Sequence, residues 1–352
     1  MQRPKVKAYV SNLKYVDGLE YLGAGYDVIK GNPLGSSDSL LDPGYRYPVI
    51  TQKSANCPRN NSNCITVNSL LSIPMGVWVR RLSSCAKQER VRSLTQSNNT
   101  LDTKNIKNDL KFDVSIESPS PNDEHAFTAA FSFASSFSYD NLMKIATSRG
   151  HSIQQNMVYC YKYVTGYSLP VDKLSYSSEF AKFVKSLPVD FFAADCVASF
   201  YKTYPKSDNC KSVNSWMTLF NIFGTHFVTL VFLGGKIIIN DTINTQQDIQ
   251  NVKRNAQLNI DLNAKALDLS LDVGTSLSKN SNYTTSGATK SIYFLGGSVA
   301  SPLDNFSAWS DSLSEHAMPV RITLQPLHLI LPAQLTDSYN SAYQYYATLA
   351  PD

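Results

Sequence analysis

Five histidines and six cysteines are the residues of this 352-residue chain whose types could support catalysis or bind a metal. His226 follows Thr225, a pair that could serve as base and nucleophile, but no acidic residue lies near them in the sequence to orient the imidazole. His328 lies in an apolar stretch, as structural core histidines do. The chain has no glycine-rich phosphate loop, no HExxH and no G-x-S-x-G motif. The sequence therefore predicts that the protein is not an enzyme and uses no cofactor or small-molecule substrate.

The cysteines form no CxxC pair and no histidine lies at zinc-finger spacing, so we expect no metal site. Their even number and five Asn-x-Ser/Thr sequons favour a protein made in the secretory route. Fifteen disulfide pairings are formally possible. Short loops close most easily. The pairs favoured on this basis are Cys57–Cys64 and Cys196–Cys210, which leaves Cys85–Cys160.

The composition is that of a globular protein, with 43% apolar and 17% charged residues. A net charge of +4 gives no reason to expect a nucleic-acid partner, and it would not oppose an anionic membrane surface. No apolar run approaches the roughly 18 residues of a spanning helix, and no apolar segment follows the basic start as in a signal peptide. The chain is either cytosolic or a mature or trimmed piece of a longer one, and the cysteines favour the second.

Residues 223–239 read FGTHFVTLVFLGGKIII and predict one long, bent strand that is entered from a turn. Phe227 to Leu233 is an unbroken apolar or β-branched run of strand length. Gly234 and Gly235 interrupt the run before it resumes. Because glycine reaches backbone angles that other residues cannot, the pair predicts a sharp bend within the strand.

Residues 125–139, HAFTAAFSFASSFSY, carry no formal charge and alternate between a mostly aromatic face and a face of Thr, Ala and Ser. A strand in the core of a sandwich would fit this pattern. A membrane-spanning β-strand fits it as well, because such a strand has about 9–11 residues with one apolar and one small or polar face. The apolar face comprises Phe127, Ala129, Phe131, Phe133, Phe137 and Tyr139.

Residues 243–288 contain a second unusual pattern, in which alternation of apolar and polar side chains slips by one position. The alternating apolar positions are Leu258, Ile260 and Leu262, followed by Leu267, Leu269, Leu271 and Val273. The same segment also fits an amphipathic helix, since apolar residues recur every three or four positions. An ordinary helix is one explanation, and a segment that is a helix in one state and a strand in another is the second.

Helical spacing predicts helices over 177–186, 190–200, 213–222 and about 336–349. Strands are expected over 111–117, 158–167, 291–295 and 320–331. Residues 84–108 are polar and charged, which favours a helix or a surface linker.

The stretch 223–235 resembles the signature of the membrane attack complex/perforin (MACPF) family: an aromatic residue, Gly-Thr or Gly-Ser, His, an aromatic residue, six residues, then Gly-Gly. Every position matches, at Phe223, Gly224, Thr225, His226, Phe227, Gly234 and Gly235. Residues 18–50 also resemble the beginning of apicomplexan perforin-like proteins, in GAGYDVIKGNPLG and DPGYR. The similarity extends over roughly residues 20–349.

The resemblance implies an α+β, MACPF/cholesterol-dependent-cytolysin-like fold, with a bent four-stranded antiparallel sheet and two helical clusters that can become transmembrane hairpins. It implies an N-terminal extension over 1–17 and a single MACPF domain over 18–350. The first hairpin cluster would be 119–152 and the second 243–288. Strand one would be about 107–118, and Cys85 and Cys160 occupy positions similar to a family disulfide. We expect no separate membrane-targeting domain within this chain.

The function that the resemblance implies is pore formation. The protein would be secreted, from a secretory organelle such as the micronemes, and would form a ring or arc of identical subunits on the lipid bilayer of a target cell. Each subunit would insert two β-hairpins into a large β-barrel pore, for parasite egress or cell traversal. The alternative is a non-lytic adhesion or scaffold protein with the same fold.

The signature residues would have a structural role at the bend, and Gly234 and Gly235 would act as the hinge. A bulky residue at Gly234 would then leave secretion intact but abolish lysis.

Overall fold

The computed structural model describes residues 14–31, 44–52, 66–68, 71–82, 88–94, 114–116, 152–243, 289–298 and 306–349. Within these ranges, nine strands form one large sheet and three short strands form a second. The large sheet comprises β2 (Ala24–Tyr26), β3 (Tyr45–Pro48), β6 (Val77–Arg81), β7 (Gln88–Leu94), β8 (Val114–Ile116), β9 (Ser152–Tyr167), β10 (His226–Ile243), β11 (Thr289–Leu295) and β12 (Met318–Pro326). The small sheet comprises β1 (Lys14–Tyr15), β5 (Leu71–Ser72) and β4 (Thr66–Asn68), in that order.

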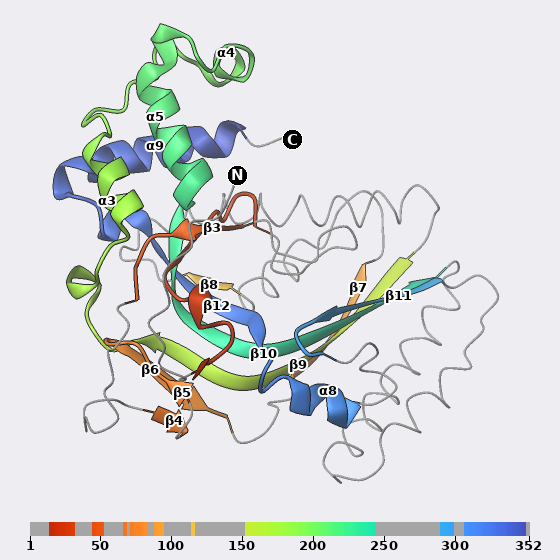
Figure 1. The fold of residues 1–352 in the computed structure, drawn as a ribbon. Helices are drawn as coiled ribbons and strands as arrows, with labels where there is room; N and C mark the ends of the chain where they lie inside the picture. The colour runs from red at the N-terminus through yellow and green to blue at the C-terminus, as the bar shows by residue number, and fades with distance from the viewer. Residues whose placement is uncertain are drawn as a thin grey trace, which may run out of the picture.

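Strand β10 is the centre of the large sheet, and the predicted long strand across Gly234 and Gly235 is confirmed. It pairs antiparallel with β9 along most of its length, and Figure 1 shows the two strands curving together. In its first half β10 also pairs with β12, and in its second half it pairs with β11. Register shifts relative to β12 and β9 fall near Leu233, immediately before the glycine pair. Such irregularities increase local bending and twist.

The strand that lies beside β9 beyond the bend is β7, which corrects the expectation that residues 107–118 would take this place. β7 pairs antiparallel with β9 from Gln88↔Tyr159 to Leu94↔Ile153. The part of 107–118 that the structure describes, β8, pairs parallel with β12 instead. Beyond the bend the strand order is therefore β7, β9, β10 and β11, and these four antiparallel strands belong to a sheet that has nine strands among the described residues.

Helices gather at the His226 end of β10, as Figure 1 shows. They are α3 (Ser178–Lys185), α4 (Ala198–Thr203), α5 (Lys211–Phe223) and α9 (Thr336–Leu349). Single 3-10 turns occur at η1 (Leu19–Tyr21), η3 (Val171–Lys173), η4 (Asp208–Cys210), η5 (Leu327–Leu329) and η6 (Ala333–Leu335). No helix in the described ranges is long and apolar enough to cross a membrane.

Helix α5 leads directly into the signature. Its buried residues recur at helical spacing and pack in the main core: Val213, Trp216, Met217, Leu219, Phe220 and Phe223. The helix ends at Gly224, whose amide donates to the carbonyl of Phe220 at 2.9 Å. The chain then turns directly into β10.

Helix α8 (Phe306–Ser312) lies apart from the other helices, against the bend of the sheet (Figure 1). It contributes to a small second core, separate from the main one. That core consists of Cys160 on β9, Ile237 on β10, and Phe306, Trp309 and Leu313 from α8 and its C-terminal end. The bend is thus packed by its own apolar cluster.

Candidate functional site at the signature turn and the strand bend

The signature turn presses against the backbone of β2, and two glycines allow this contact. Gly224 has φ +80°, and a Cβ there would lie 2.5–2.7 Å from the backbone atoms of Tyr26. A Cβ on Gly25 would lie 1.9 Å from the carbonyl oxygen of Phe223. Only glycine fits at either position. A side chain would strain the backbone at Gly224, and at both positions it would collide with the backbone of the neighbouring segment.

Thr225 joins the turn to three other parts of the chain. Its amide donates to the carbonyl of Tyr26 at 3.0 Å, and its hydroxyl accepts from the amide of Val28 at 3.2 Å. Its own carbonyl accepts from the Tyr339 hydroxyl at 2.5 Å and from the Leu327 amide at 3.2 Å. Thr225 is fully buried, so these bonds replace the water that its polar groups would otherwise bind.

His226 is buried and uncharged. Its Nδ1 lies 2.9 Å from Oγ1 of Thr225. Because that hydroxyl donates to the carbonyl of Tyr26 at 3.3 Å, the proton between the two side chains belongs to Nδ1. Burial, with a smaller contribution from His328, lowers the pKa of His226 to about 3. The ring therefore acts as a neutral hydrogen-bond donor within the junction.

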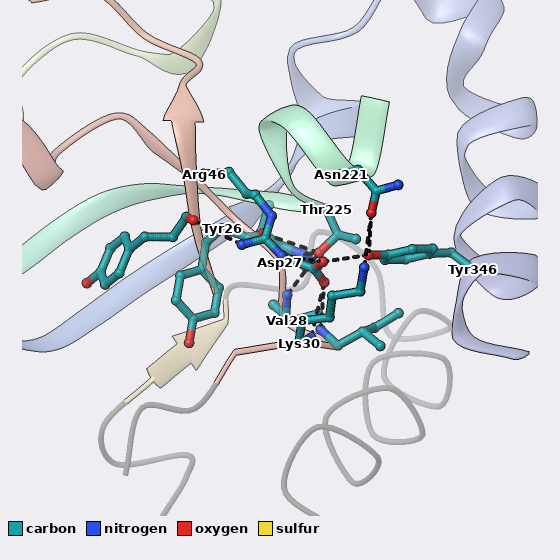
Figure 2. Close-up of polar contacts among 11 residues, drawn as sticks. Tyr26, Asp27, Val28, Lys30, Arg46, Asn221, Thr225 and Tyr346 are labelled. Carbon is teal, nitrogen blue, oxygen red and sulfur yellow. Dashed lines mark hydrogen bonds and ion pairs between the residues drawn. The ribbon is translucent and has the colours of Figure 1, made fainter. Parts of the chain in front are cut away.

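A buried carboxylate behind the turn completes the junction, and the sequence analysis did not identify it. Asp27 is fully buried, and Figure 2 shows the groups that converge on it. Its carboxylate accepts from Arg46 at 3.1 Å, from the Tyr346 hydroxyl at 2.6 Å and from the amides of Ile29 and Lys30 at 3.0 and 3.3 Å. The carboxylate thereby connects the N-terminal segment to α9.

Lys30 adds a second connection at the surface of the same junction. Its ammonium donates to Asn221 on α5 at 3.0 Å and lies 5.3 Å from the centre of the Tyr346 ring (Figure 2). The one sequence signal for this network was the resemblance of GAGYDVIKGNPLG and DPGYR to a family segment, since the first contains Asp27 and the second Arg46. The signature turn, the N-terminal segment, α5 and α9 thus form one buried polar junction.

The structure separates the signature turn from the glycine pair. The signature lies where β10 begins, in contact with β2 and α9, rather than at the bend to which we had assigned it. The bend has a different set of contacts. A Cβ on Gly234 would lie 1.8 Å from the carbonyl oxygen of Cys160, so β9 approaches too closely for any side chain.

Gly235 makes room for α8. A Cβ there would lie 2.5 Å from the Trp309 ring and 2.6 Å from Leu313. The Trp309 indole also donates to the carbonyl of Gly296 at 3.0 Å, just beyond the end of β11. Gly234 and Gly235 therefore serve distinct contacts, one with a neighbouring strand and the other with α8.

Charged groups lie on both sides of this bend. Lys236 is buried, and its ammonium lies 5.6 Å from the centre of the Tyr159 ring. Burial lowers the pKa of Lys162 on β9, while Asp311 on α8 raises it. The described residues contain no group of three or more His, Cys, Asp or Glu side chains placed to hold a metal. The turn and the bend are held by hydrogen bonds, close backbone contacts and apolar packing.

The predicted pair Cys196–Cys210 is confirmed as a disulfide. Cys160 is also disulfide-bonded, while its predicted partner Cys85 lies outside the described residues. The predicted pair Cys57–Cys64 lies outside them as well. So do all the predicted membrane-inserting positions in 127–139 and 258–273.

Replacement of Cys196 and Cys210 by alanine is expected to lower the free energy of unfolding by about 3 kcal/mol, because the disulfide closes a short loop in the unfolded chain. The two residues are 14 positions apart, and both are fully buried. Urea denaturation of the double variant and of the parent would measure the loss. An unchanged midpoint would contradict a stabilising role.

Comparison with known proteins shows which family and fold this chain resembles. The family model described as "MAC/Perforin domain" matches residues 10–351. Perforin-1 of Mus musculus is 22% identical over 357 aligned positions, which cover 91% of this chain and 57% of perforin-1. The crystal structure of GNIP1Aa from Chromobacterium piscinae aligns with a TM-score of 0.52 at 13% identity, over 95% of this chain and 57% of that one. The chain thus spans little more than half the length of either protein.

Proposed function

Because the chain belongs to the MAC/Perforin domain family, we propose that it is a pore-forming protein that assembles on a target membrane. Each subunit inserts two β-hairpins, and many subunits close a shared β-barrel. The observation that supports the proposal most strongly is where the segments that contain residues 125–139 and 243–288 join the sheet.

The second segment and the C-terminal side of the first join the same end of the sheet, on adjacent strands. Residues 244–288 connect β10 to β11, and the register pairs Thr242 with Thr289 where the two strands end. Residues 117–151 lead into β9, whose first residue, Ser152, pairs with Ile243. A hairpin formed from 244–288 would prolong β10 and β11 in register, and the C-terminal strand of a hairpin formed from 117–151 would prolong β9 beside them.

The side chains of the first segment suit such a hairpin. Phe127, Phe131 and Phe133 share one face of an alternating, charge-free run, while small or hydroxyl residues occupy the other. The first face would contact lipid and the second a water-filled lumen. An open sheet edge in lipid would leave backbone N–H and C=O groups unpaired at a cost of several kcal/mol each, so insertion requires a closed ring of subunits.

The same proposal places the protein in the secretory route, since the Cys196–Cys210 disulfide would persist in an oxidising compartment. Egress or cell traversal is the use that the apicomplexan resemblance of residues 18–50 implies for such a pore.

Single-cysteine variants across 127–139, each labelled with a polarity-sensitive dye, test the proposal on the otherwise native chain. The protein is tethered to liposomes through a tag, so that initial binding does not limit the result. We expect dyes at 127, 129, 131, 133, 137 and 139 to enter lipid and dyes at the even-numbered positions from 128 to 138 to remain in water. A dye at the exposed Thr203 on α4 serves as the matched control and should remain in water in every case.

A flat dye profile on folded, tethered protein would contradict membrane insertion. It would favour the adhesion or scaffold alternative, because a non-inserting protein needs no alternating, charge-free segment. Release of an encapsulated fluorophore from the same liposomes, together with the alternating profile, would support a pore.

A further inference from the structure

Two histidines that are distant in the sequence lie in one cluster with two tyrosines of α9. The ring of His226 lies 6.0 Å from that of Tyr343, and the ring of His328 in η5 lies 5.4 Å from that of Tyr339. The two tyrosine rings are 6.1 Å apart and nearly parallel, with 5° between their planes. The four rings therefore form a continuous row across the inner face of α9, which we call the His–Tyr row.

The His–Tyr row lies where α9 contacts the signature turn. Tyr339 donates its hydroxyl proton to the carbonyl of Thr225, and the same carbonyl accepts from the amide of Leu327, the first residue of η5. His226 donates to the side chain of Thr225 from the other side. We propose that the His–Tyr row is an acid-sensitive clasp, in which protonation of His226 releases α9 and η5 from the signature turn.

Because His226 is buried only in the closed clasp, acid favours the open form. The pKa of His226 is about 3 in the closed clasp, because burial disfavours the charged ring and His328 adds to the effect. In an open clasp the ring meets water and its pKa returns to about 6.5. The open form then binds a proton more tightly than the closed form, so the clasp loses stability as the pH falls below about 6.5 and continues to lose it down to about 3. Between pH 7.5 and 5.0 the open population is expected to rise about 30-fold relative to the closed one.

The groups around His226 do not supply a compensating charge. The titratable or charged side chains on the elements packed around it include Tyr26 on β2, His328 on η5, Tyr339, Tyr343 and Tyr346 on α9, and Asp27, Lys30 and Arg46 in the N-terminal segment. Burial, reinforced by Asp27, holds the pKa of Tyr343 and of Tyr346 far above the usual range, so both remain neutral. Asp27 already accepts from Arg46 and from Tyr346. A proton on the His226 imidazole is therefore opposed by burial and by His328.

Hydrogen exchange of the folded chain at pH 7.5 and 5.0, corrected for intrinsic chemical exchange, tests the clasp without a membrane. Protection of the amides of α9 is expected to fall about 30-fold between the two conditions. His226→Asn keeps a donor near the position of Nδ1 but cannot be protonated, so the fall should largely disappear. His316→Asn is the matched control and should retain the full fall, since His316 is exposed and lies outside the His–Tyr row.

His226→Gln is the second variant, and it decides the test if His226→Asn does not fold. Its amide cannot be protonated either, so the pH-dependent loss of protection should also disappear in this variant. Equal protection of α9 at both pH values in the parent chain would overturn the proposal. An equal loss in α8, which lies at the distant bend, would also overturn it, because it would show global rather than local opening.

Discussion

Gly234→Ala is expected to lower the free energy of unfolding by about 4 kcal/mol and to reduce the yield of folded protein. The new Cβ would lie 1.8 Å from the carbonyl oxygen of Cys160, and this oxygen belongs to the backbone of a paired strand. Overpacking by a methyl group usually costs about 1–3 kcal/mol, because side chains can rearrange. Here β9 itself must move. Urea denaturation with far-UV circular dichroism measures the difference.

Gly235→Ala provides the matched comparison, because the atoms that oppose it are mainly side chains. Its Cβ would meet Trp309 at 2.5 Å and Leu313 at 2.6 Å. Leu313→Ala should therefore cost less in the Gly235→Ala background than in the parent, with a coupling energy of about 1 kcal/mol. In the Gly234→Ala background the same change should be additive. Equal rescue of both glycine variants would contradict the division of roles between the two glycines.

This contact also changes the expectation for secretion. From the sequence, a bulky residue at Gly234 should abolish lysis alone, because the glycine pair was interpreted only as a hinge. The closed sheet already needs Gly234, so the variant is now expected to be poorly secreted as well. Lysis by a Gly234 variant is therefore interpretable only per molecule of folded protein.

The elements with strong periodicity were predicted correctly from the sequence. The apolar run before and after the glycine pair gave one long strand, and the helices expected over 177–186, 213–222 and about 336–349 appear as α3, α5 and α9. In each case the local pattern and the tertiary packing favour the same structure, as α5 shows by burying Trp216 and Phe220 on one face.

The helix expected over 190–200 begins only at Ala198, and tertiary contacts explain the difference. The amide of Phe191 donates to the Ser338 hydroxyl on α9, and the amide of Phe192 donates to the Ser212 hydroxyl on α5. These bonds give two backbone amides of the segment partners outside a helix, and the disulfide at Cys196 further constrains the chain there. A sequence window does not contain such partners.

Strand β7 was missed because its sequence, QERVRSL, is rich in charge. Charged residues are common on edge strands, where they discourage association with other chains, so polarity alone does not exclude a strand. The pairing that defines β7 comes from β9, which follows more than fifty residues later in the sequence.

The junction around Asp27 could not be predicted from local pattern. Arg46 lies 19 positions from Asp27 in the sequence, and Tyr346, which binds the same carboxylate, lies 319 positions from it. No spacing rule joins residues so distant. Gly224 of the signature could be identified by resemblance, but the reason for a glycine there, close contact with the backbone of β2, is visible only in the fold.

Asp27→Asn is expected to lower the free energy of unfolding by about 4 kcal/mol, because it leaves a partly buried guanidinium without its carboxylate. The Arg46 side chain is only 16% exposed and lies 3.1 Å from Asp27. Tyr346→Phe removes a single hydrogen bond to the same carboxylate and should cost about 2 kcal/mol. Asp172→Asn is the control, since its pair with Lys173 is largely exposed, and it should change stability by no more than about 0.5 kcal/mol.

The order of these three losses tests whether Asp27 is the centre of the junction. If it is, Tyr346→Phe should cost less in the Asp27→Asn background than in the parent, because the hydroxyl then donates to a neutral amide. The Asp27→Asn chain should also show weaker hydrogen-exchange protection in α9 and in the signature turn, because Asp27 joins the segment behind that turn to α9. A loss for Asp27→Asn no larger than that for Asp172→Asn would mean that backbone packing at Gly25 and Gly224 suffices to hold the turn, and that the carboxylate adds nothing to it.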